Sequence, residues 1–368
     1  MGRWRGLQAL ALALILCVSG CASGRPAAEP LLTFLGQSQV AFGTTVDGTA
    51  VGGLSGITYD AGRQVYYVIS DDRSKHGPAR FYTVQISLSD NGIDHINCTS
   101  AHPFGDRSGP SGLGAAPVPN QAHIPPDPEG IAFDAGRQRL YWSAEGERRT
   151  DREPVLADPW VRIAALDGGY LGQFALPPNL AMSEQRTGPR RNMALEGLTL
   201  APDGRSLFAA MEEPGYNDGP LTNGDHRVLT RITKFDVADA APVAQYAYPM
   251  EPAGHGADRN GVADLVALSD NTFLVLERST ATPPVARIYR AEIGSATDVS
   301  NMESMQGATL TSMSKVLAID LSATLKPVDN LEGITLGPKL PDGRQSVVLV
   351  SDNNFSPFQI TQFVLLAM

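Results

Sequence analysis

Three glutamates precede a glycine in three similar stretches of the sequence, at Glu129, Glu196 and Glu332. In a weaker copy of the same pattern, Asp264 stands next to the equivalent position. Carboxylate oxygens are hard ligands that favour Ca²⁺ or Mg²⁺. A metal ion held by them could polarise a phosphoryl or carboxyl ester and deliver water to it. The pattern therefore predicts that the three glutamates are catalytic residues, and that all four acids are metal ligands.

A second set of acids follows the first at a nearly constant distance. Three of them lie 16 residues after the matching position of their copy, and the fourth lies 20 residues after it; the set is Asp71, Glu145, Glu212 and Asp352. In the weaker copy, Glu277 stands at the corresponding place, and we add the four acids of the set to the predicted metal ligands. Another interpretation stays open, because a glutamate at a strand start can accept backbone N–H groups and lock neighbouring units together.

Other catalytic groups are few. His255 lies just before the inner strand of the weaker copy, so we add it as a candidate general base, the alternative being an ordinary loop histidine. The motifs G-x-S-x-G, H-E-x-x-H and C-x-x-C are all absent. Beyond the N-terminal segment, Cys98 is the only cysteine, so neither an intramolecular disulfide nor a cysteine zinc site is expected. Metal-assisted hydrolysis, with water as the nucleophile, is the best enzymatic interpretation.

The candidate acids belong to a repeat that organises the whole chain. Five copies of one pattern, each two short strands joined by a turn, begin 74, 67, 67 and 69 residues apart, at Ser55, Glu129, Glu196, Ala263 and Glu332. Gly and Asp in the turns favour tight hairpins. A long self-similar period of this kind is typical of propellers and other repeat folds.

Further strands complete each copy. A third strand is expected in all five copies, at residues 80–88, 160–166, 228–237, 286–293 and 359–366. A fourth is expected in four copies, at residues 96–103, 170–176, 243–248 and 315–320. The last copy ends before its fourth strand, and the apolar residues 31–40 can complete it. We therefore predict an all-β propeller of five four-stranded blades, closed by the N-terminal strand, with six blades as the alternative.

Composition agrees with a single β-rich domain. The chain has 368 residues, 37 of them Gly and 27 Pro, with 42% hydrophobic and 18% charged residues. This composition excludes a disordered chain and a coiled coil. The formal net charge of −10 argues against a nucleic-acid partner, because phosphate backbones require a basic face.

The N-terminal residues predict export. Residues 1–20 contain two arginines, a short apolar run and small residues, as a secretory signal peptide does. The ending Val18-Ser19-Gly20-Cys21 resembles the lipobox of bacterial lipoproteins, which implies lipidation of Cys21. Residues 21–30 would then form a lipidated tether, and residues 31–368 the propeller domain. An ordinary signal peptide with a coincidental cysteine is the alternative. We expect an exported protein whose only membrane contact is a lipid anchor in the bacterial envelope.

The repeated motifs resemble those of the phytase-like family, described as having esterase-like activity of phytase. The resemblance covers residues 50–366 and rests on the stretches GLSGITYD, DPEGIAFD, NMALEGLTLAPDGRSLFAAMEE, NGVADLVALSDNTFLVLERS and NLEGITL with VLVSDNN. It implies a propeller and a hydrolase of phosphate or carboxylic esters. Glu129, Glu196 and Glu332 match the repeated Glu-Gly motif, whereas Ser55 and Ala263 depart from it.

Two functions from different classes remain. The first is an exported lipoprotein that hydrolyses a small phosphate ester or other ester with a divalent cation, Ca²⁺ being the expected one. The second is a non-catalytic propeller that binds a ligand or an envelope protein, its acids being structural. Propellers carry many unrelated functions, so the fold does not choose between them. The oligomeric state is left open.

Overall fold

The fold is described from a computed structural model of the chain. The described residues are 1–2, 31–107, 124–224, 226–253, 259–281 and 284–368. The predicted signal peptide, Cys21 and the tether lie outside them, apart from residues 1–2, and so does His255. No helix within these ranges has the length and apolar character needed to cross a membrane.

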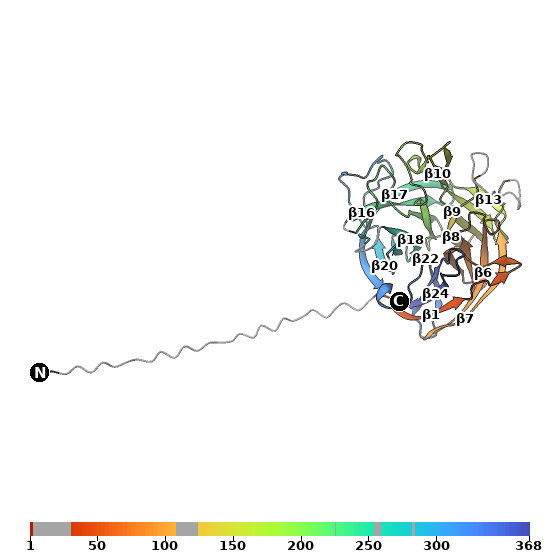
Figure 1. The fold of residues 1–368 in the computed structure, drawn as a ribbon, viewed down its shortest axis with the longest axis horizontal. Helices are drawn as coiled ribbons and strands as arrows, with labels where there is room; N and C mark the ends of the chain where they lie inside the picture. Colours follow the sequence, from red (N-terminus) through yellow and green to blue (C-terminus); the bar gives the residue numbers. More distant parts are fainter. Residues whose placement is uncertain (3–30, 108–123, 225, 254–258, 282–283) are drawn as a thin grey trace.

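Five antiparallel four-stranded sheets stand around a central axis as the blades of a β-propeller (Figure 1). The prediction of five blades is confirmed. Each blade places its first strand next to the axis, where the five inner strands contact one another in a closed ring. The inner strands of blades 1 to 5 are β4 (Leu54–Asp60), β8 (Pro128–Asp134), β14 (Leu195–Leu200), β18 (Asn260–Ala267) and β22 (Leu331–Lys339).

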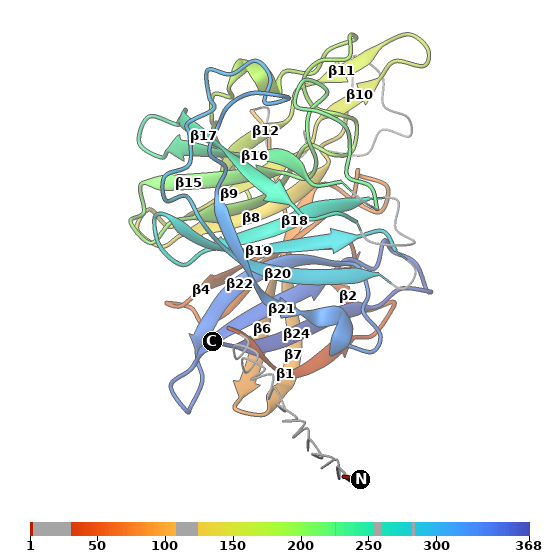
Figure 2. The ribbon, with the colours of Figure 1, turned by 90° about the vertical axis from the view of Figure 1, so that its left-hand side faces the viewer.

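The second strands are almost fully buried, because neighbouring blades pack against both faces of each blade (Figure 2). The second strands are β5 (Val65–Ser70), β9 (Arg139–Ala144), β15 (Ser206–Met211), β19 (Thr272–Ser279) and β23 (Gln345–Ser351). The third strands are β6 (Arg80–Ser89), β12 (Trp160–Ala165), β16 (Val228–Asp236), β20 (Val285–Glu292) and β24 (Thr361–Ala367).

The outer strand of blade 5 comes from the start of the described domain. Strand β1 (Thr33–Val40) pairs antiparallel with β24, which confirms the predicted closure of the circle by the N-terminal strand. This pairing joins the two ends of the propeller by backbone hydrogen bonds. The other outer strands are β7 (Gly92–Pro103), β13 (Tyr170–Gln173), β17 (Ala241–Met250) and β21 (Ser314–Asp320).

Short elements lie in the loops between the strands of the blades. Two small hairpins and two 3₁₀ helices are found in the described ranges: β2 (Thr45–Val46) with β3 (Thr49–Ala50), β10 (Glu147–Arg149) with β11 (Val155–Ala157), η1 (Pro178–Leu180) and η2 (Leu321–Ala323). Helix in this part of the chain is limited to the two 3₁₀ turns, in agreement with the all-β prediction.

Five hydrophobic clusters lie between adjacent blades and hold the ring together. Between blades 1 and 2, for example, Ile69 packs in one cluster with Ile131 and Trp142. Burying such side chains contributes about 1.5–3 kcal/mol each, which is the main source of the ring's stability. The propeller is therefore a rigid frame for any site on its axis.

A β-bulge occurs in every inner strand at the position where the sequence repeat begins. In blade 1, Leu54 pairs with Ser70 and Gly56 with Ile69, so Ser55 is the extra residue. In blade 5, Leu331 pairs with Ser351 and Gly333 with Val350, so Glu332 is the extra residue. Blades 2, 3 and 4 shift register at the same place. A bulge re-aims side chains, and this repeated one sits where the glutamates begin each unit.

The glycine after the bulge residue is required by close packing between inner strands, as blades 1 and 2 show. A Cβ atom on Gly56 would lie 2.6 Å from the carbonyl oxygen of Glu129, and one on Gly130 would lie 2.5 Å from that of Glu196. Both distances are shorter than any real contact. The Glu-Gly motif thus combines a side chain at the bulge with a residue that lets the neighbouring blade approach.

An apolar ring closes the channel below the bulges. One residue from each inner strand contributes to it, namely Ile57, Ile131, Leu198, Leu265 and Ile334, all of them buried. A cavity of about 220 Å³ lies at the end of the channel opposite the bulges, lined by the ring and by later residues of the inner strands. The end of the channel at the start of the inner strands is therefore separated from the opposite end.

Candidate functional site

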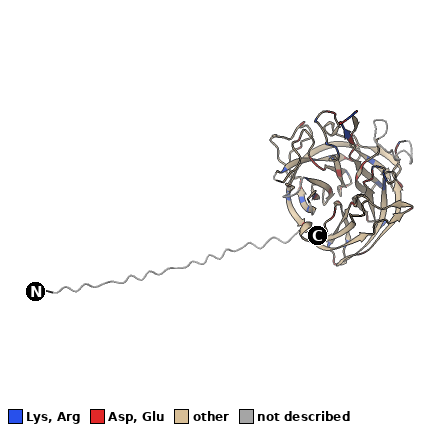
Figure 3. Cartoon of the chain, viewed as in Figure 1, with Lys and Arg blue, Asp and Glu red and all other residues tan. Residues whose placement is uncertain are grey.

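Acidic side chains gather where the inner strands begin, an end of the channel that we call the mouth. Two positions per blade define it. One is the bulge residue of the inner strand. The other is the residue near the end of the second strand that pairs with the position two residues before the bulge. Figure 3 shows acidic residues close to the axis as well as on the outer loops. The bulge residues are Ser55, Glu129, Glu196, Ala263 and Glu332, and their second-strand partners are Asp71, Glu145, Glu212, Arg278 and Asp352.

Backbone pairing shows that these second-strand positions are equivalent. The amide of Asp71 donates to the carbonyl of Gly53 at 2.6 Å, and the amide of Glu145 donates to the carbonyl of Asp127 at 3.1 Å. Glu212 and Asp352 make the same bond to the residue two positions before their own bulge. Arg278 pairs with Gly261, which stands two positions before Ala263.

This equivalence corrects the sequence alignment of blade 4, which placed Glu277 among the mouth acids. Alternate residues of a strand point to opposite faces, so Arg278 faces the mouth and Glu277 faces away from it. The Glu277 carboxylate accepts hydrogen bonds from Tyr248 Oη at 2.8 Å and Asn260 Nδ2 at 2.8 Å, and it pairs with Lys315.

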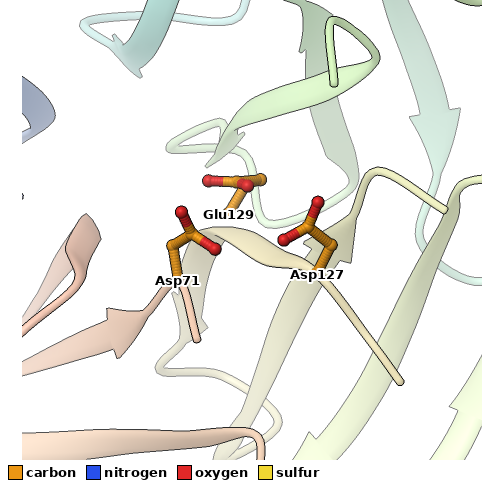
Figure 4. Close-up of side chains that lie close together, drawn as sticks. All are labelled: Asp71, Asp127 and Glu129. Carbon is orange, nitrogen blue, oxygen red and sulfur yellow. The ribbon is translucent and has the colours of Figure 1, made fainter. Parts of the chain in front are cut away.

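Five acids lie close together on one side of the mouth, and we call them the acid cluster. One carboxylate oxygen from each of Asp71, Asp127 and Glu129 lies within 4.8 Å of the other two (Figure 4). Glu129, Glu145 and Glu196 form a second triad by the same measure. Glu129 belongs to both triads, and all five side chains are buried or half-buried.

Burial and like charge make the ionised cluster unfavourable without a cation. Burial raises the pKa of Asp71 well above its ordinary value, and the charges of Asp127 and Asp352 add to the rise. Burial likewise raises the pKa of Glu129, with Glu196 as the next cause, and that of Glu145, with Asp127 as the next cause. The pKa of Glu196 is raised for the same reasons. A bound cation reverses this effect because it stabilises the charged forms.

Two buried oxygens of the cluster lack a hydrogen-bond partner among the described residues, Asp127 Oδ1 and Glu145 Oε2. Their side chains are about 3% and 1% exposed. Arg73 pairs with the other oxygen of Asp127 and lies 3.9 Å from Glu145 Oε2. Buried polar atoms are normally satisfied, so these orphaned oxygens fit a cation ligated by the cluster. The donor set, all carboxylate oxygen, suits Ca²⁺ or Mg²⁺.

The remaining mouth acids surround Arg278 on the other side. Glu332 Oε1 lies 3.0 Å from Arg278 Nη2 and accepts a hydrogen bond from Asn330 Nδ2 at 2.8 Å. Burial raises the pKa of Glu332 to about 8 and that of Asp352 to about 6, although the charge of Arg278 opposes both shifts. Burial also raises the pKa of Glu212, again opposed by Arg278.

Asp264 is apart from both groups. It stands where the other blades have glycine, and its carboxylate accepts backbone N–H bonds from three blades: from Leu198 at 3.3 Å, from Leu265 at 2.8 Å and from Ile334 at 2.8 Å. Those three donors belong to the apolar ring. The blade-locking role that was the alternative for the Glu-Gly motif is thus observed at Asp264.

The predicted site residues therefore separate into three groups. Asp71, Glu129, Glu145 and Glu196 meet in the acid cluster, Glu212, Glu332 and Asp352 lie around Arg278, and Asp264 lies between inner strands. Sequence reasoning missed Asp127. The motif DPEG indicates Asp127 as a partner of Glu129, because residues two apart in an extended segment share a face. Asp127 and Glu129 therefore point the same way.

A polar cavity of about 240 Å³ opens beside the acid cluster. Its basic side chains come from the loop after β5, and the His76 ring stacks on Phe355 with centroids 4.2 Å apart. The cavity joins one carboxylate of the cluster to a wall that can bind anions. Its lining residues are Asp71, Asp72, Arg73, Lys75, His76, Asn192, Asn354 and Phe355.

A sequence model of the Phytase-like family, described as esterase-like activity of phytase, matches residues 49–355. The chain belongs to the Phytase-like family. The match extends from before Ser55 to beyond Asp352, so the phytase-like region contains every bulge residue and all the mouth acids. The family resemblance indicated by the repeated motifs is confirmed. A comparison with curated proteins found no match to the phytase-like chain.

Solved structures similar to this phytase-like chain are distant. An engineered GH43 glycoside hydrolase is 12% identical, with a TM-score of 0.41 and coverage of 85% of this chain and 48% of that one. An exo-β-1,3-galactanase from Phanerochaete chrysosporium with galactose is 11% identical, with a TM-score of 0.45 and coverage of 89% and 64%. The chain thus spans about half of the first and under two thirds of the second. The protein U3-55K is 9% identical, with a TM-score of 0.32 and coverage of 94% and 100%. None of these likenesses bears on the chemistry of the mouth.

Proposed function

We propose that this phytase-like propeller is a metal-dependent hydrolase of phosphate esters or other small esters. The observation that carries the proposal is the pair of carboxylate triads that share Glu129, with orphaned buried oxygens on Asp127 and Glu145. Asp264 satisfies both of its oxygens with backbone donors. In the acid cluster, Glu145 Oε1 accepts the backbone N–H of Ala194, but Asp127 Oδ1 and Glu145 Oε2 accept no hydrogen bond from the described residues and are available to a cation.

Asp71, Asp127 and Glu129 would hold the metal ion, with Glu145 and Glu196 completing the second triad. Calcium is the ion we propose, because it accepts several carboxylate oxygens in flexible geometry. When bound, such an ion polarises an ester and lowers the pKa of water. Burial raises the pKa of Glu196, so this carboxylate would be suited to accept a proton during the reaction.

The cavity beside the cluster supplies substrate binding. Arg73 and Lys75 place positive charge on its wall, and Asn192 adds an amide. These groups can orient an anionic part of a substrate while its ester bond lies toward Asp71. Arg73 is already paired with Asp127, so it also links the position of the substrate to that of the cluster.

We further propose that the protein is exported and lipid-anchored through Cys21. The direction of β1 indicates where such a tether would join the propeller relative to the mouth. Thr33 pairs with Ala367 and Val40 pairs with Thr361, so β1 begins at the end of blade 5 far from the mouth residue Asp352. The nine residues 22–30 can span at most about 30 Å. A tether there would leave the mouth facing away from the membrane. Replacing Cys21 with Ser should release the protein from membranes, and continued retention would contradict the anchor.

Hydrolysis is tested with the purified protein on aryl phosphates, phytate and short aryl esters, with Ca²⁺ and with a chelator. We expect turnover of at least one substrate class that the chelator abolishes and Glu129→Gln lowers at least tenfold. Glu292→Gln is the matched control, because Glu292 lies on β20 in an exposed pair with Arg290. Absence of turnover in every condition would favour the non-catalytic binding propeller.

A further inference from the structure

Arg278 occupies a ring position that is acidic in the other four blades. Its equivalents are Asp71, Glu145, Glu212 and Asp352, and each of them directly follows the end of a second strand at the mouth. In blade 4 the bulge residue is Ala263, so this blade contributes no carboxylate at either mouth position. Blade 4 instead contributes one guanidinium, which points toward acids of blades 3 and 5.

The contacts of Arg278 are those of a counter-ion. Its Nη2 lies 3.0 Å from Glu332 Oε1, and its side chain is only 17% exposed. Burial lowers the pKa of the guanidinium, but the charges of Glu332, Glu212 and Glu196 outweigh this effect and raise it overall. Its Nε atom is buried with no hydrogen-bond partner among the described residues. The group is therefore held by surrounding negative charge more than by a complete set of hydrogen bonds.

The two sides of the mouth differ in which groups neutralise their carboxylates. Around Arg278, Glu332 accepts two directed contacts, from Arg278 and Asn330. In the acid cluster, Asp127 Oδ1 and Glu145 Oε2 are buried and accept no hydrogen bond from the described residues. Arg73 contacts the cluster from the cavity side and lies 3.9 Å from Glu145 Oε2, but it donates a hydrogen bond to neither oxygen.

We propose that Arg278 is a built-in cation, which takes the place of a second divalent ion at Glu212, Glu332 and Asp352 and confines metal binding to the acid cluster. The inference rests on the proposed function, because it assumes that the cluster binds a divalent ion. A fixed charge of this kind excludes a second ion by Coulomb repulsion, which is strong at short range in a partly buried site. It also leaves the cluster as the single place where a metal ion and a substrate can meet.

The decisive experiment counts calcium ions. Isothermal titration of Ca²⁺ into the full-length protein is compared for the wild type, Arg278→Met and Arg278→Lys. We expect Arg278→Met to bind one more ion per chain than the wild type, because the buried Glu332 and Asp352 and the half-buried Glu212 lose their cation. Arg278→Lys keeps a positive charge and should retain the wild-type number. Arg287→Met is the matched control, because Arg287 lies in the same blade and pairs with Asp320 away from the mouth.

The outcomes separate the two proposals. If the wild type binds no Ca²⁺, the proposed metal-dependent function fails and this inference fails with it. If the wild type binds Ca²⁺ but Arg278→Met gains no ion, only the inference on Arg278 is overturned. A merely structural arginine would lower stability without raising the number of bound ions.

Two further variants keep the test decisive if Arg278→Met does not fold. Arg278→Gln removes the charge but keeps an amide donor for Glu332, and it should show the same gain of one ion. Arg278→Gln combined with Glu332→Gln removes one of the proposed ligands, so the extra ion should be lost. Retention of the extra ion in this double variant would place it elsewhere and overturn the assignment. Native mass spectrometry with Ca²⁺ gives an independent count.

Discussion

The hydroxyl of Ser55 donates a hydrogen bond to the main-chain carbonyl oxygen of Glu129 at 3.0 Å. Ser55 is the bulge residue of blade 1, where a glutamate would follow the repeat. Its side chain thus holds the backbone of the glutamate that both carboxylate triads share. The departure of blade 1 from the Glu-Gly motif therefore has a local structural use.

We expect Ser55→Ala to destabilise the protein by about 1 kcal/mol, the usual net value of such a bond. The affinity for Ca²⁺ should also fall severalfold, because the position of Glu129 becomes less well defined. Urea unfolding and calcium titration measure the two effects. Ser87→Ala, at an exposed position of β6, should change neither. An unchanged calcium affinity in Ser55→Ala would show that the bond does not position the cluster.

Glu129→Gln should remove most of the metal affinity, because this residue alone belongs to both triads. We expect the affinity for Ca²⁺ to fall at least tenfold. In a chelator at pH 8 the same variant should be more stable than the wild type, because one buried like charge is gone. Thermal melting with Ca²⁺ measures the loss of stabilisation by the ion, and melting without Ca²⁺ measures the gain in stability of the metal-free variant. Equal melting shifts on Ca²⁺ addition in the variant and the wild type would contradict the assignment.

The metal-free protein should lose stability as the pH rises. Burial raises the folded pKa of Glu332 to about 8 and that of Asp352 to about 6, against about 4 in unfolded chains. Carboxyl groups shifted upward bind more protons in the folded state, so their stabilisation is present at low pH and is lost as the pH rises through the folded pKa. Melting temperatures in a chelator should fall from pH 5 to pH 8. Calcium should stabilise most at pH 8, where it meets the least competition from protons.

Asp264→Asn should act on stability and leave metal binding intact. The carboxylate accepts three backbone N–H bonds from three blades, whereas an amide offers one acceptor oxygen and a donor group that meets other donors. We expect a loss of about 2–3 kcal/mol in the free energy of unfolding. The number of bound calcium ions should not change. Loss of an ion in a folded Asp264→Asn protein would place Asp264 among the metal ligands.

Lys75→Ala tests the cavity wall. Lys75 lines the cavity, and its backbone amide donates to Asp72, which is not one of the five cluster acids, so metal binding should be retained. For an anionic ester we expect KM to rise severalfold with kcat nearly unchanged, since the lost interaction is with the bound substrate. A neutral ester should show no difference. A fall in kcat alone would argue against a role in binding.

Sequence periodicity predicted the architecture almost completely. The five repeat starts, the third and fourth strands and the closure by residues 31–40 are all matched by elements of the structure. These features are local, because alternating apolar residues and Gly-rich turns specify strands and hairpins wherever they occur. The Glu-Gly motif was equally visible, and the packing of Gly130 against Glu196 explains its glycine.

The site depended on relationships that no single stretch contains. In blade 4, Gly261 of β18 pairs with Arg278 of β19, which puts Arg278 rather than Glu277 at the mouth. Asp127 joined the cluster because the segment before β8 brings it beside Asp71 from another blade. Both facts come from the pairing of strands and the approach of blades.

The sequence by itself predicted five blades, with six as the alternative, the way the circle closes and acids at equivalent places in the repeat, because strand periodicity and turns depend on residues that are close together in the chain. Only the tertiary structure decided how those acids divide. It brought Asp71, Asp127, Glu129, Glu145 and Glu196 together, set Arg278 against Glu332, and tied Asp264 to three backbones. The physical reason is that charge pairing and burial act across blades, between residues far apart along the chain.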